Sequence, residues 1–481
     1  MASIATSNIE DPEALLAAPT AGMRENPFRL KRDSSSFSSK SSQFKVSSKN
    51  FERQFSHIYT KRLEVMKPRV QEHMKAVWPE TKVVPRVIDL AVGNVQWAFA
   101  GTVYKDMKLK PCVLDEFTNE AILQGLPEEK DNYVAEDDSL VLEDETGRVS
   151  LVVSESCSSK VSELVSGIVI GVRGHVTESG EVMVVDLCYP GMPRLQDPRP
   201  DMAERTPHVL LVSGFNIGNN DDIGKLKLKL LTDCITGQLG SPLEQDTVWR
   251  HVTRVIVAGN SLASLADKDG RDTLSRDEQD TLAAPLKEAD AMFGQIARSV
   301  PIDVMPGASD PSNVNMPQQP LHPCLLPFSN CFKNHFSCVT NPYRADVEGV
   351  EILGHSGQPV KDIKKFTSLE SEIEVLERTL KWQHLAPTAP DTLACYPFYK
   401  RDPFVMSAKC PHVMFTGNAS KFETRTVDGP NGQSVRLIAV PEFSKSGSAV
   451  LMNLQSLEVK EVSFQLQNIG GSEPTAHNQQ A

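Results

Sequence analysis

The 481-residue sequence lacks several features that would each point to a particular class of protein. Its nine cysteines are scattered and form no CxxC pair, so neither a disulfide framework nor a treble-clef zinc site is predicted. No apolar run reaches the roughly 18 residues that a membrane helix needs. The N-terminal stretch carries acids where a secretion signal would carry bases, so we expect an intracellular, soluble protein.

Basic residues are also few relative to acidic ones. The chain has 50 lysines and arginines against 62 aspartates and glutamates, which gives a formal net charge of −12. A protein that binds DNA by itself usually presents a basic surface that displaces the counterions around the phosphates. We therefore expect the isolated chain to bind DNA weakly. Its length allows two or three domains of about 100–200 residues each.

Both ends of the chain are predicted to be disordered tails. Residues 1–48 are rich in serine and lysine and offer too little apolar surface to offset the entropy lost on ordering. The basic patch at Arg29, Lys31 and Arg32 is compatible with an import signal or a phosphorylation-controlled arm, but such patches are more often plain solubilising sequence. The polar residues 467–481 are expected to form the second tail.

Residues 49–80 are predicted to form a helical cap on the domain that follows. Apolar residues recur there at helical spacing, which indicates one buried face. They are Phe51, Phe55, Ile58, Tyr59, Leu63 and Met66. Pro68 can start a second helix, because proline suits the first helical turn. The apolar residues of that second helix are Val70, Met74, Val77 and Trp78.

Residues 81–200 have the pattern of a small β-barrel. Short runs of β-branched and aromatic residues, such as WAFAGTVYK and SGIVIGVRGHV, alternate with Gly, Asp and Glu turns. About five such strands favour an OB-fold. OB-folds that bind single strands use aromatic platforms on a basic groove, whereas this stretch is acidic and has few suitably spaced aromatics. A protein-binding OB-fold is therefore the favoured interpretation.

From about residue 201 the sequence alternates strands with helices. HVLLVSGFNIG, TRVIVAGNSL and SVPIDVMPGASDP each run from an apolar strand into a Gly-containing polar loop. Helically spaced apolar residues between 282 and 296, and a second set behind a capping box from Thr367 to Glu370, predict two helices. Residues 201–466 are thus expected to form a layered α/β domain around a central sheet.

The loops at the ends of these strands are where an α/β sheet normally binds its ligands. Their order resembles that of calcineurin-like metallophosphoesterases, in which carboxylates and imidazoles hold two metal ions. In this sequence Gly, Asn, Ala or Ser stands at most of the corresponding positions, and the isolated histidine falls at His355 or Ser356. The degenerate positions are Gly214, Asn216, Asn260, Ala308, Ser309, Asp310, His355, Asn418 and Ser420. The resemblance implies a phosphoesterase-type α/β sandwich that lacks its metal ligands, with no catalytic residue, no metal and no cofactor.

An OB-fold followed by such a domain resembles the small B-subunits of eukaryotic replicative DNA polymerases. Long proline-rich strings, among them LAPTAPDTLACYPFYKRDPF and CPHVMFTGNASKFETRTVDGP, are similar to those of the polymerase delta B-subunits, as is the early string NFERQFSHIYTKRLEVMKP. The resemblance covers residues from about 50 to about 465. The B-subunits of polymerases alpha and epsilon share the architecture, but not the LAPTAPDTLACYPFYK string.

This resemblance implies a nuclear, non-catalytic scaffold in DNA replication and repair synthesis. Its implied partners are the cysteine-rich C-terminal module of the catalytic subunit, a third accessory subunit that reaches the sliding clamp, and a small fourth subunit. DNA would be reached only through the complex, and no membrane is implied. Four aromatic residues of one proline-rich loop are expected to be exposed and to contact a partner. They are Tyr396, Phe398, Tyr399 and Phe404.

Three other interpretations stay open. A cysteine and histidine group could bind zinc, although its spacing matches no common ligand pattern. That group comprises His322, Cys324, Cys331, His335 and Cys338. An active phosphodiesterase is the second alternative, and the loss of charged ligand types argues against it. The third is a free-standing single-strand DNA binder that works through the OB-fold, which the acidic net charge disfavours.

Overall fold

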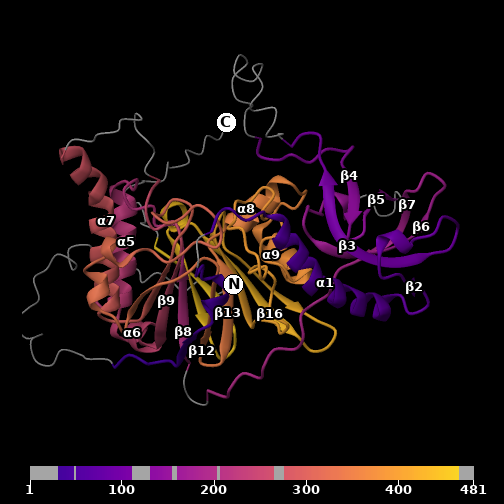
Figure 1. Ribbon diagram of the computed structural model, residues 1–481. Helices are drawn as coiled ribbons and strands as arrows, with labels where there is room; N and C mark the ends of the chain where they lie inside the picture. Colours follow the sequence, from indigo (N-terminus) through magenta and orange to yellow (C-terminus); the bar gives the residue numbers. More distant parts are fainter. Residues whose placement is uncertain are drawn as a thin grey trace, which may run out of the picture.

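The computed structural model of the protein describes residues 31–47, 50–110, 130–153, 160–202, 206–264 and 276–464. In this part of the chain a small β-barrel and a larger unit with two β-sheets lie side by side, with one long helix between them (Figure 1). None of the described helices has the length and apolar character needed to cross a lipid bilayer. The tail predicted at 467–481 and the basic residue Arg29 lie outside the described residues.

Six strands make up the smaller unit in the described part of the chain. They are β2 (Lys82–Val83), β3 (Trp97–Asp106), β4 (Ser139–Glu143), β5 (Arg148–Val153), β6 (Val169–Val176) and β7 (Val182–Cys188). Hydrogen bonds run in the order β3-β4-β5-β7-β6, and β6 pairs back with β3, so five strands close into a barrel. Each pair in this ring is antiparallel except β5 with β7. This closed order is that of an OB-fold, as the sequence predicted.

Alternation of buried and exposed side chains produces the barrel. In β5 the side chains of Val149 and Leu151 are buried, and those of the alternate residues Arg148, Ser150 and Val152 are exposed. The inward side chains pack into a core that also contains Trp382 from the larger unit. The barrel and the larger unit therefore share one apolar core along their contact.

Helix α1 (Ser56–Val77) lies against the barrel. Its buried residues are Ile58, Arg62, Met66, Val70 and Met74. Pro68 lies inside this helix, so the prediction of a second helix that begins there is wrong. Proline removes one main-chain hydrogen bond, but the buried stripe continues on both sides of it, and this packing outweighs the loss. Phe51 and Phe55 precede the helix and are 63% and 45% exposed, so their predicted place on the buried face is also wrong.

Two six-stranded sheets form the larger unit within the described residues. The first has the order β1-β12-β13-β14-β16-β15, and the second has the order β11-β10-β9-β8-β17-β18. Strands of the first are β1 (Phe37–Ser39), β12 (Tyr343–Val347), β13 (Val350–His355), β14 (Val413–Ala419), β15 (Glu423–Asp428) and β16 (Ser434–Pro441). Strands of the second are β8 (His208–Val212), β9 (Val252–Ala258), β10 (Ile302–Met305), β11 (Phe336–Cys338), β17 (Ser448–Asn453) and β18 (Val459–Ser463).

Helices cover the outer faces of the two sheets, which gives the larger unit four layers (Figure 1). Helices α5 (Asp222–Thr236) and α7 (Arg276–Ala297) pack on the second sheet, and α8 (Gln358–Lys365) and α9 (Glu372–Trp382) lie on the side of the first. The remaining short helices are α6 (Pro242–Thr247), α10 (Phe443–Ser446), η2 (Ser41–Phe44), η3 (Val87–Asp89), η4 (Trp249–His251), η5 (Pro323–Leu325) and η6 (Ser329–Cys331). Helix α9 is capped by Ser371, so the capping box predicted from Thr367 is wrong.

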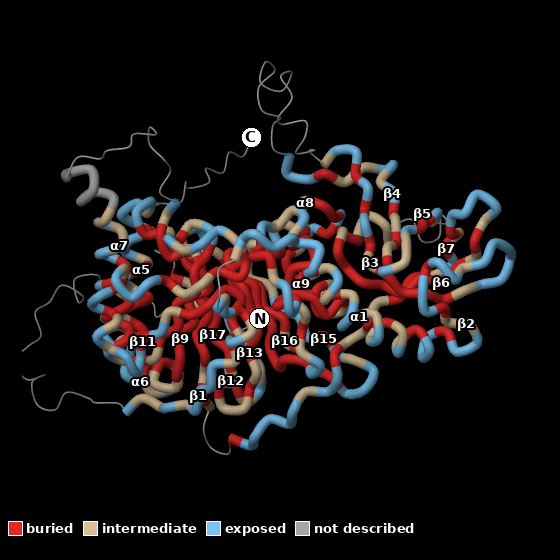
Figure 2. The backbone as a smooth tube through the Cα atoms, viewed as in Figure 1, coloured by how far each residue is buried: buried red, intermediate tan, exposed pale blue. Residues whose placement is uncertain are grey.

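The sequence predicted a layered α/β domain around a central sheet, and the structure has two sheets packed against each other. Every residue of β9 and of β14 is buried, so both faces of these strands are covered. One face of each strand packs on helices, and the other face packs against the opposite sheet, as Ile256 and Phe415 do in their shared core. Buried residues accordingly run through the middle of both sheets (Figure 2). A strand buried on both faces has no polar alternation that would reveal a second sheet.

Residues 31–47 form an ordered segment, so the tail predicted at 1–48 is wrong for this part. Strand β1 pairs antiparallel with the edge strand β12, and the Arg32 guanidinium donates to the Trp249 carbonyl at 2.6 Å. Phe44 is fully buried in the core beside α9. The composition argument fails because main-chain hydrogen bonds to distant residues order this segment, and composition does not report them. We call residues 31–47 the N-terminal strap.

Candidate functional site

The strand-end loops of both sheets meet at one edge of the larger unit. The Asn216 N–H donates to the Asn260 carbonyl at 3.1 Å, which ties the loop after β8 to the loop after β9. The side-chain amide of Asn418 donates to the carbonyls of Ala258 (3.1 Å) and Ser356 (2.8 Å), and so links the two sheets. The structure therefore brings the predicted loop positions together, as expected for the carboxyl ends of parallel strands.

Asp310 is the one carboxylate among these positions, and main-chain donors surround it. Its oxygens accept N–H groups from Gly307 (2.7 Å), Leu262 (2.9 Å) and Ser261 (3.2 Å). Burial raises the pKa of the Asp310 carboxyl above its ordinary value, although these N–H groups act in the opposite direction. The side chain thus holds the loops after β9 and β10 together and has few lone pairs left for a ligand.

Replacing this carboxylate by its amide tests the structural role. Asp310→Asn is expected to lower the free energy of unfolding by about 1–2 kcal/mol, because an amide nitrogen would face N–H groups that need an acceptor. Urea unfolding followed by tryptophan fluorescence measures this loss, and Asp131→Asn, at an exposed position, serves as the matched control. A diesterase activity that disappears in Asp310→Asn would contradict a purely structural role.

Three asparagines at this edge adopt the left-handed backbone conformation. Asn216, Asn260 and Asn418 have φ angles of 49°, 53° and 54°. Asparagine is among the few residues other than glycine that tolerate this region. The Asn216 amide donates to the Ser444 hydroxyl at 2.9 Å, and the Asn260 side-chain oxygen accepts the Ser309 N–H at 3.3 Å. These amides therefore close the loops on one another.

His355 is the last residue of β13, and Ser356 follows directly after the strand. Its side chain is fully buried, and burial lowers the pKa of the imidazole to about 3, so it is neutral at pH 7. Nδ1 accepts the Gly357 N–H at 3.1 Å, which places the ring proton on Nε2. One neutral imidazole and one carboxylate already occupied by N–H groups are too few ligands for two divalent ions.

Of the three remaining loop positions, Gly214 is buried, and its N–H donates to the Gly259 carbonyl at 2.9 Å. The other two lie at the rim of the edge. Ala308 is exposed, and the exposed Ser420 donates to the Glu372 carboxylate at 3.1 Å. Next to them the structure holds a buried amide cluster that the sequence analysis missed. The Asn341 amide donates to the Gln318 side-chain oxygen at 2.8 Å and to the Ser356 hydroxyl at 2.6 Å. Nothing in the spacing of these residues predicts the cluster.

A metal site finds no support in the described part of the chain. No group of three or more His, Cys, Asp or Glu side chains there is placed to hold an ion. The histidines of the suspected zinc group are used elsewhere: His335 Nδ1 lies 2.9 Å from the Ala297 carbonyl, and His322 accepts the Cys324 N–H. The structure therefore does not assemble this group into a ligand set.

The aromatic loop predicted to contact a partner is largely interior. Phe404 is fully buried and Tyr396 is 7% exposed, so the prediction that they are exposed is wrong. Phe404 belongs to the core that contains residues of α9, and Phe398 packs at the margin of that core. The Tyr396 ring lies 5.5 Å from the Phe398 ring. Tyr399 alone among the four is exposed, at 49%. Proline-rich composition suggested an exposed loop, but this loop folds back under helix α1.

An ion cluster that the sequence analysis missed joins α1 to both units. Arg62 is fully buried, and its Nε lies 2.7 Å from the Asp402 carboxylate. Its Nη1 donates to the carbonyls of Gly167 in the barrel and Pro387 in the larger unit, at 2.9 and 2.7 Å. His384 Nε2 lies 2.9 Å from the same carboxylate. A signal was available, since Arg62 occupies one place in the four-residue repeat of buried α1 positions.

The electrostatics of this cluster follow from its burial. Burial alone would raise the pKa of Asp402, but the charge of Arg62 and the hydrogen bonds from Arg62 and His384 hold it below its ordinary value. Burial and the nearby guanidinium lower the pKa of His384 to about 4. Asp402 is therefore ionised and His384 neutral at pH 7. The arrangement lies in the interior of the protein and serves to hold α1 in place.

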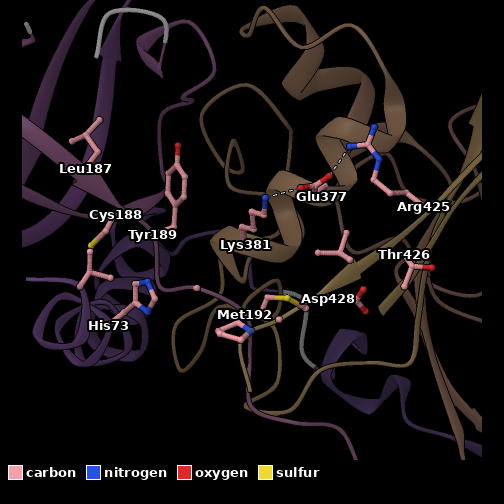
Figure 3. Close-up of a pocket in the computed structure, with 15 residues that line it drawn as sticks. His73, Leu187, Cys188, Tyr189, Met192, Glu377, Lys381, Arg425, Thr426 and Asp428 are labelled. Atoms are coloured by element: carbon pink, nitrogen blue, oxygen red, sulfur yellow. Dashed lines mark hydrogen bonds and ion pairs between the residues drawn. The ribbon is translucent and has the colours of Figure 1, made fainter. Parts of the chain in front are cut away.

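A pocket of about 600 Å³ lies where α1, the end of β7, α9 and β15 meet (Figure 3). His73, Tyr189 and Met192 contribute to one side. On the other side the Glu377 carboxylate accepts from Lys381 and Arg425, each at 2.6 Å, so its charge is balanced. The pocket mixes apolar and paired charged groups at the junction of the two units, and nothing in it resembles an acid and base pair aimed at a substrate.

Comparison with known proteins agrees with this architecture. Residues 54–187 match the family described as DNA polymerase delta subunit OB-fold domain. Residues 209–424 match the family of alpha/epsilon B-subunits of DNA polymerases. The first match covers α1 and the barrel strands, and the second covers most strands of the larger unit.

Relatives that match over most of the chain are DNA polymerase delta subunits. The chain is 40% identical over 437 residues to the DNA polymerase delta small subunit of Arabidopsis thaliana, covering 91% of this chain and 97% of the relative. It is 34% identical to DNA polymerase delta subunit 2 of Drosophila melanogaster, with 88% and 96% covered. It is 32% identical to the DNA polymerase delta small subunit of Saccharomyces cerevisiae, with 86% and 90% covered. The chain therefore belongs to the family of DNA polymerase delta small subunits.

Proposed function

We propose that the chain is the non-catalytic scaffold subunit of a polymerase delta complex and connects the catalytic subunit to the other accessory subunits in DNA replication and repair synthesis. One observation carries this proposal. At the edge where an α/β enzyme would bind substrate, Asp310 and the asparagines bind the neighbouring loops instead. Such an edge contributes rigidity, which a scaffold needs, and offers no free acid, base or nucleophile for turnover.

We further propose that the larger unit is a phosphoesterase-type sandwich whose metal ligands have been replaced. The four layers and the order of the strand-end loops support this assignment. On this proposal Gly214, Asn216 and Asn260 stand where metal-binding acids or imidazoles would be needed, and His355 is the imidazole that remains. The proposed domains are the helical cap, the OB-fold at 81–200 and the sandwich at 201–466, to which the N-terminal strap is added.

The joined core of the two units suits a subunit that several partners contact at once. We propose that its partners are the cysteine-rich C-terminal module of the catalytic subunit, a third accessory subunit that leads to the sliding clamp, and a small fourth subunit. DNA would be reached through the complex, in the nucleus. The pocket at the junction has room for one or two side chains of a partner.

Adding the C-terminal module of the catalytic subunit is expected to raise the thermal midpoint of the protein. A partner that binds only the folded form stabilises it by about 2.7 kcal/mol when its free concentration is a hundred times the dissociation constant. Differential scanning fluorimetry with and without the purified module measures the shift, and an unrelated zinc module of equal size is the control.

Two results together would contradict the scaffold role. One is an unchanged midpoint with no co-elution at micromolar concentrations of both proteins. The other is tight, salt-dependent binding of the isolated chain to single-stranded oligonucleotides, which would favour the OB-fold as a DNA-binding module.

A further inference from the structure

A compact group of exposed aromatic and basic side chains lies where the segment before α1 meets the loop at Tyr399. Among the described residues only six aromatic side chains are strongly exposed, and three of them belong to this group: Phe51 (63%), Phe55 (45%) and Tyr399 (49%). We call the group the aromatic patch. Its members are Phe51, Arg53, Phe55, His57, Tyr399, Lys400 and Arg401. Clustering of large exposed aromatics marks an interaction site more often than scattered apolar residues do.

Four members of the patch, Phe51, Arg53, His57 and Tyr399, already contact neighbouring rings within the chain. The Phe51 ring packs edge-on against Tyr396, with 5.0 Å between the ring centroids. The His57 ring meets Tyr399 at 4.7 Å, and the Arg53 guanidinium lies 5.4 Å from the centre of the same ring. Side chains that are already held in place lose less entropy on binding. The patch can therefore present its aromatic anchors at low cost.

The charge of the patch is opposite to that of the chain. The whole chain carries a formal net charge of −12, but the patch combines Arg53, Lys400 and Arg401 with Glu52 as the one carboxylate between residues 51 and 57. Within the part of the chain that the structure describes, no ion pair neutralises these three cations, and Arg401 donates to the Gln43 carbonyl instead. Unneutralised cations beside exposed aromatics favour an anionic partner.

A protein segment fits this surface better than DNA does. Stacking of bases needs open ring faces, whereas the Tyr399 ring already has Arg53 over it and His57 at its side. Three fixed cations on an acidic chain also release few counterions from a phosphate backbone. Tyrosine, phenylalanine and arginine are the residues enriched at the centres of protein interfaces.

We propose that the aromatic patch docks an acidic segment with aromatic or leucine anchors, contributed by another subunit of the complex. This inference rests on the proposed scaffold role. The anchors would pack against Phe51, Phe55 and Tyr399, and the carboxylates would pair with the arginines and Lys400. The contact is distinct from the strand-end edge and from the pocket at the junction.

Tiled 15-residue peptides that cover the other subunits provide the test, with binding to the full-length chain measured by fluorescence anisotropy. Tiles that combine acids with aromatic or leucine residues are expected to bind. The double variant Tyr399→Ser and Phe51→Ser should lower the affinity for the best tile at least ten-fold. The double variant Arg53→Gln and Arg401→Gln should lower that affinity and also make it less dependent on salt concentration. Tyr104→Ser, at a barrel position that is 46% exposed, is the matched control and should leave binding unchanged. Thermal midpoints of all variants verify that they are folded.

Several outcomes would overturn the proposal. One is that no acidic tile binds, or that the best tile binds the patch variants as well as it binds the unaltered chain, while the complex still assembles. Another is that a 20-nucleotide oligo-thymidine binds the unaltered chain in competition with the best tile but does not bind the patch variants. This result would assign the patch to DNA. A third is binding that appears only after residues 1–30 are deleted, which would show that a segment of this chain occupies the patch. Failure of the complex to assemble at all would instead count against the scaffold role.

Discussion

Arg62→Met is expected to lower the free energy of unfolding by about 3–5 kcal/mol, because it leaves the Asp402 carboxylate buried without its cation. The guanidinium also donates to carbonyls in both units, at Gly167 and Pro387, and methionine can satisfy neither. Urea unfolding with separate probes for the barrel and the larger unit measures the loss. Because Arg62 joins the units, the two transitions are expected to move apart in the variant.

Two further variants separate the charge effect from general damage to the helix. Lys61→Met removes an exposed pair with Glu64 on the same helix and is expected to cost less than about 1 kcal/mol. Arg62→Met combined with Asp402→Leu should recover at least half of the loss, because the uncompensated charge is gone. A loss for Arg62→Met no larger than that for Lys61→Met would show that the buried pair contributes little.

Lowering the pH from 7 to 5 is expected to cost about 2 kcal/mol of stability through each of two buried histidines. Burial lowers the pKa of His355 from 6.5 to about 3, and burial together with Arg62 lowers that of His384 from 6.5 to about 4. The unfolded chain takes up these protons near pH 6.5, whereas the folded chain does not. This stability is therefore fully present above about pH 6.5 and is lost as the pH falls toward the folded values.

Comparison with a variant isolates this effect from the rest of the titration. Burial raises the pKa of Asp303 and Asp310, so these carboxyls favour the folded state as the pH falls and act against the histidines. His355→Asn should therefore lose about 2 kcal/mol less than the unaltered chain between pH 7 and pH 5. Urea midpoints at half-unit pH steps measure the difference. Parallel pH profiles for the two proteins would rule out this role of His355.

The candidate site shows how far sequence reasoning reaches. The strand-end loops could be located from the sequence, because each follows an apolar run and ends in Gly-containing polar residues. What the side chains do there could not be derived. The role of Asp310 depends on N–H groups from Leu262 and Ser261, which lie 48 and 49 residues away in the chain. The amide cluster around Asn341 likewise depends on the distant Gln318 and Ser356.

The aromatic loop is the clearest failure of the sequence analysis. Tyr396 and Phe404 are predicted to be exposed because prolines and polar residues surround them. In the structure both are buried: Phe404 lies in the core that contains residues of α9, and Tyr396 lies against Phe51 from the segment before α1. Conversely, the spacing of Phe51 and Phe55 fits the helical repeat of α1, but both residues lie before the helix and are exposed. Local spacing predicts which residues could share a face and does not tell whether another segment covers that face.

The individual barrel strands and the alternation of strands and helices in the larger unit could be predicted from the sequence, because short-range periodicity encodes them. The presence of two packed sheets, the continuity of α1 through Pro68 and the order of the N-terminal strap became visible only in the folded structure. These three depend on contacts between segments far apart in the chain. Arg32 reaches the Trp249 carbonyl across 217 residues, and Arg62 reaches Asp402 across 340. The stabilising free energy of such a contact depends on both segments and on how the fold brings them together, so it cannot be predicted from either stretch of sequence alone.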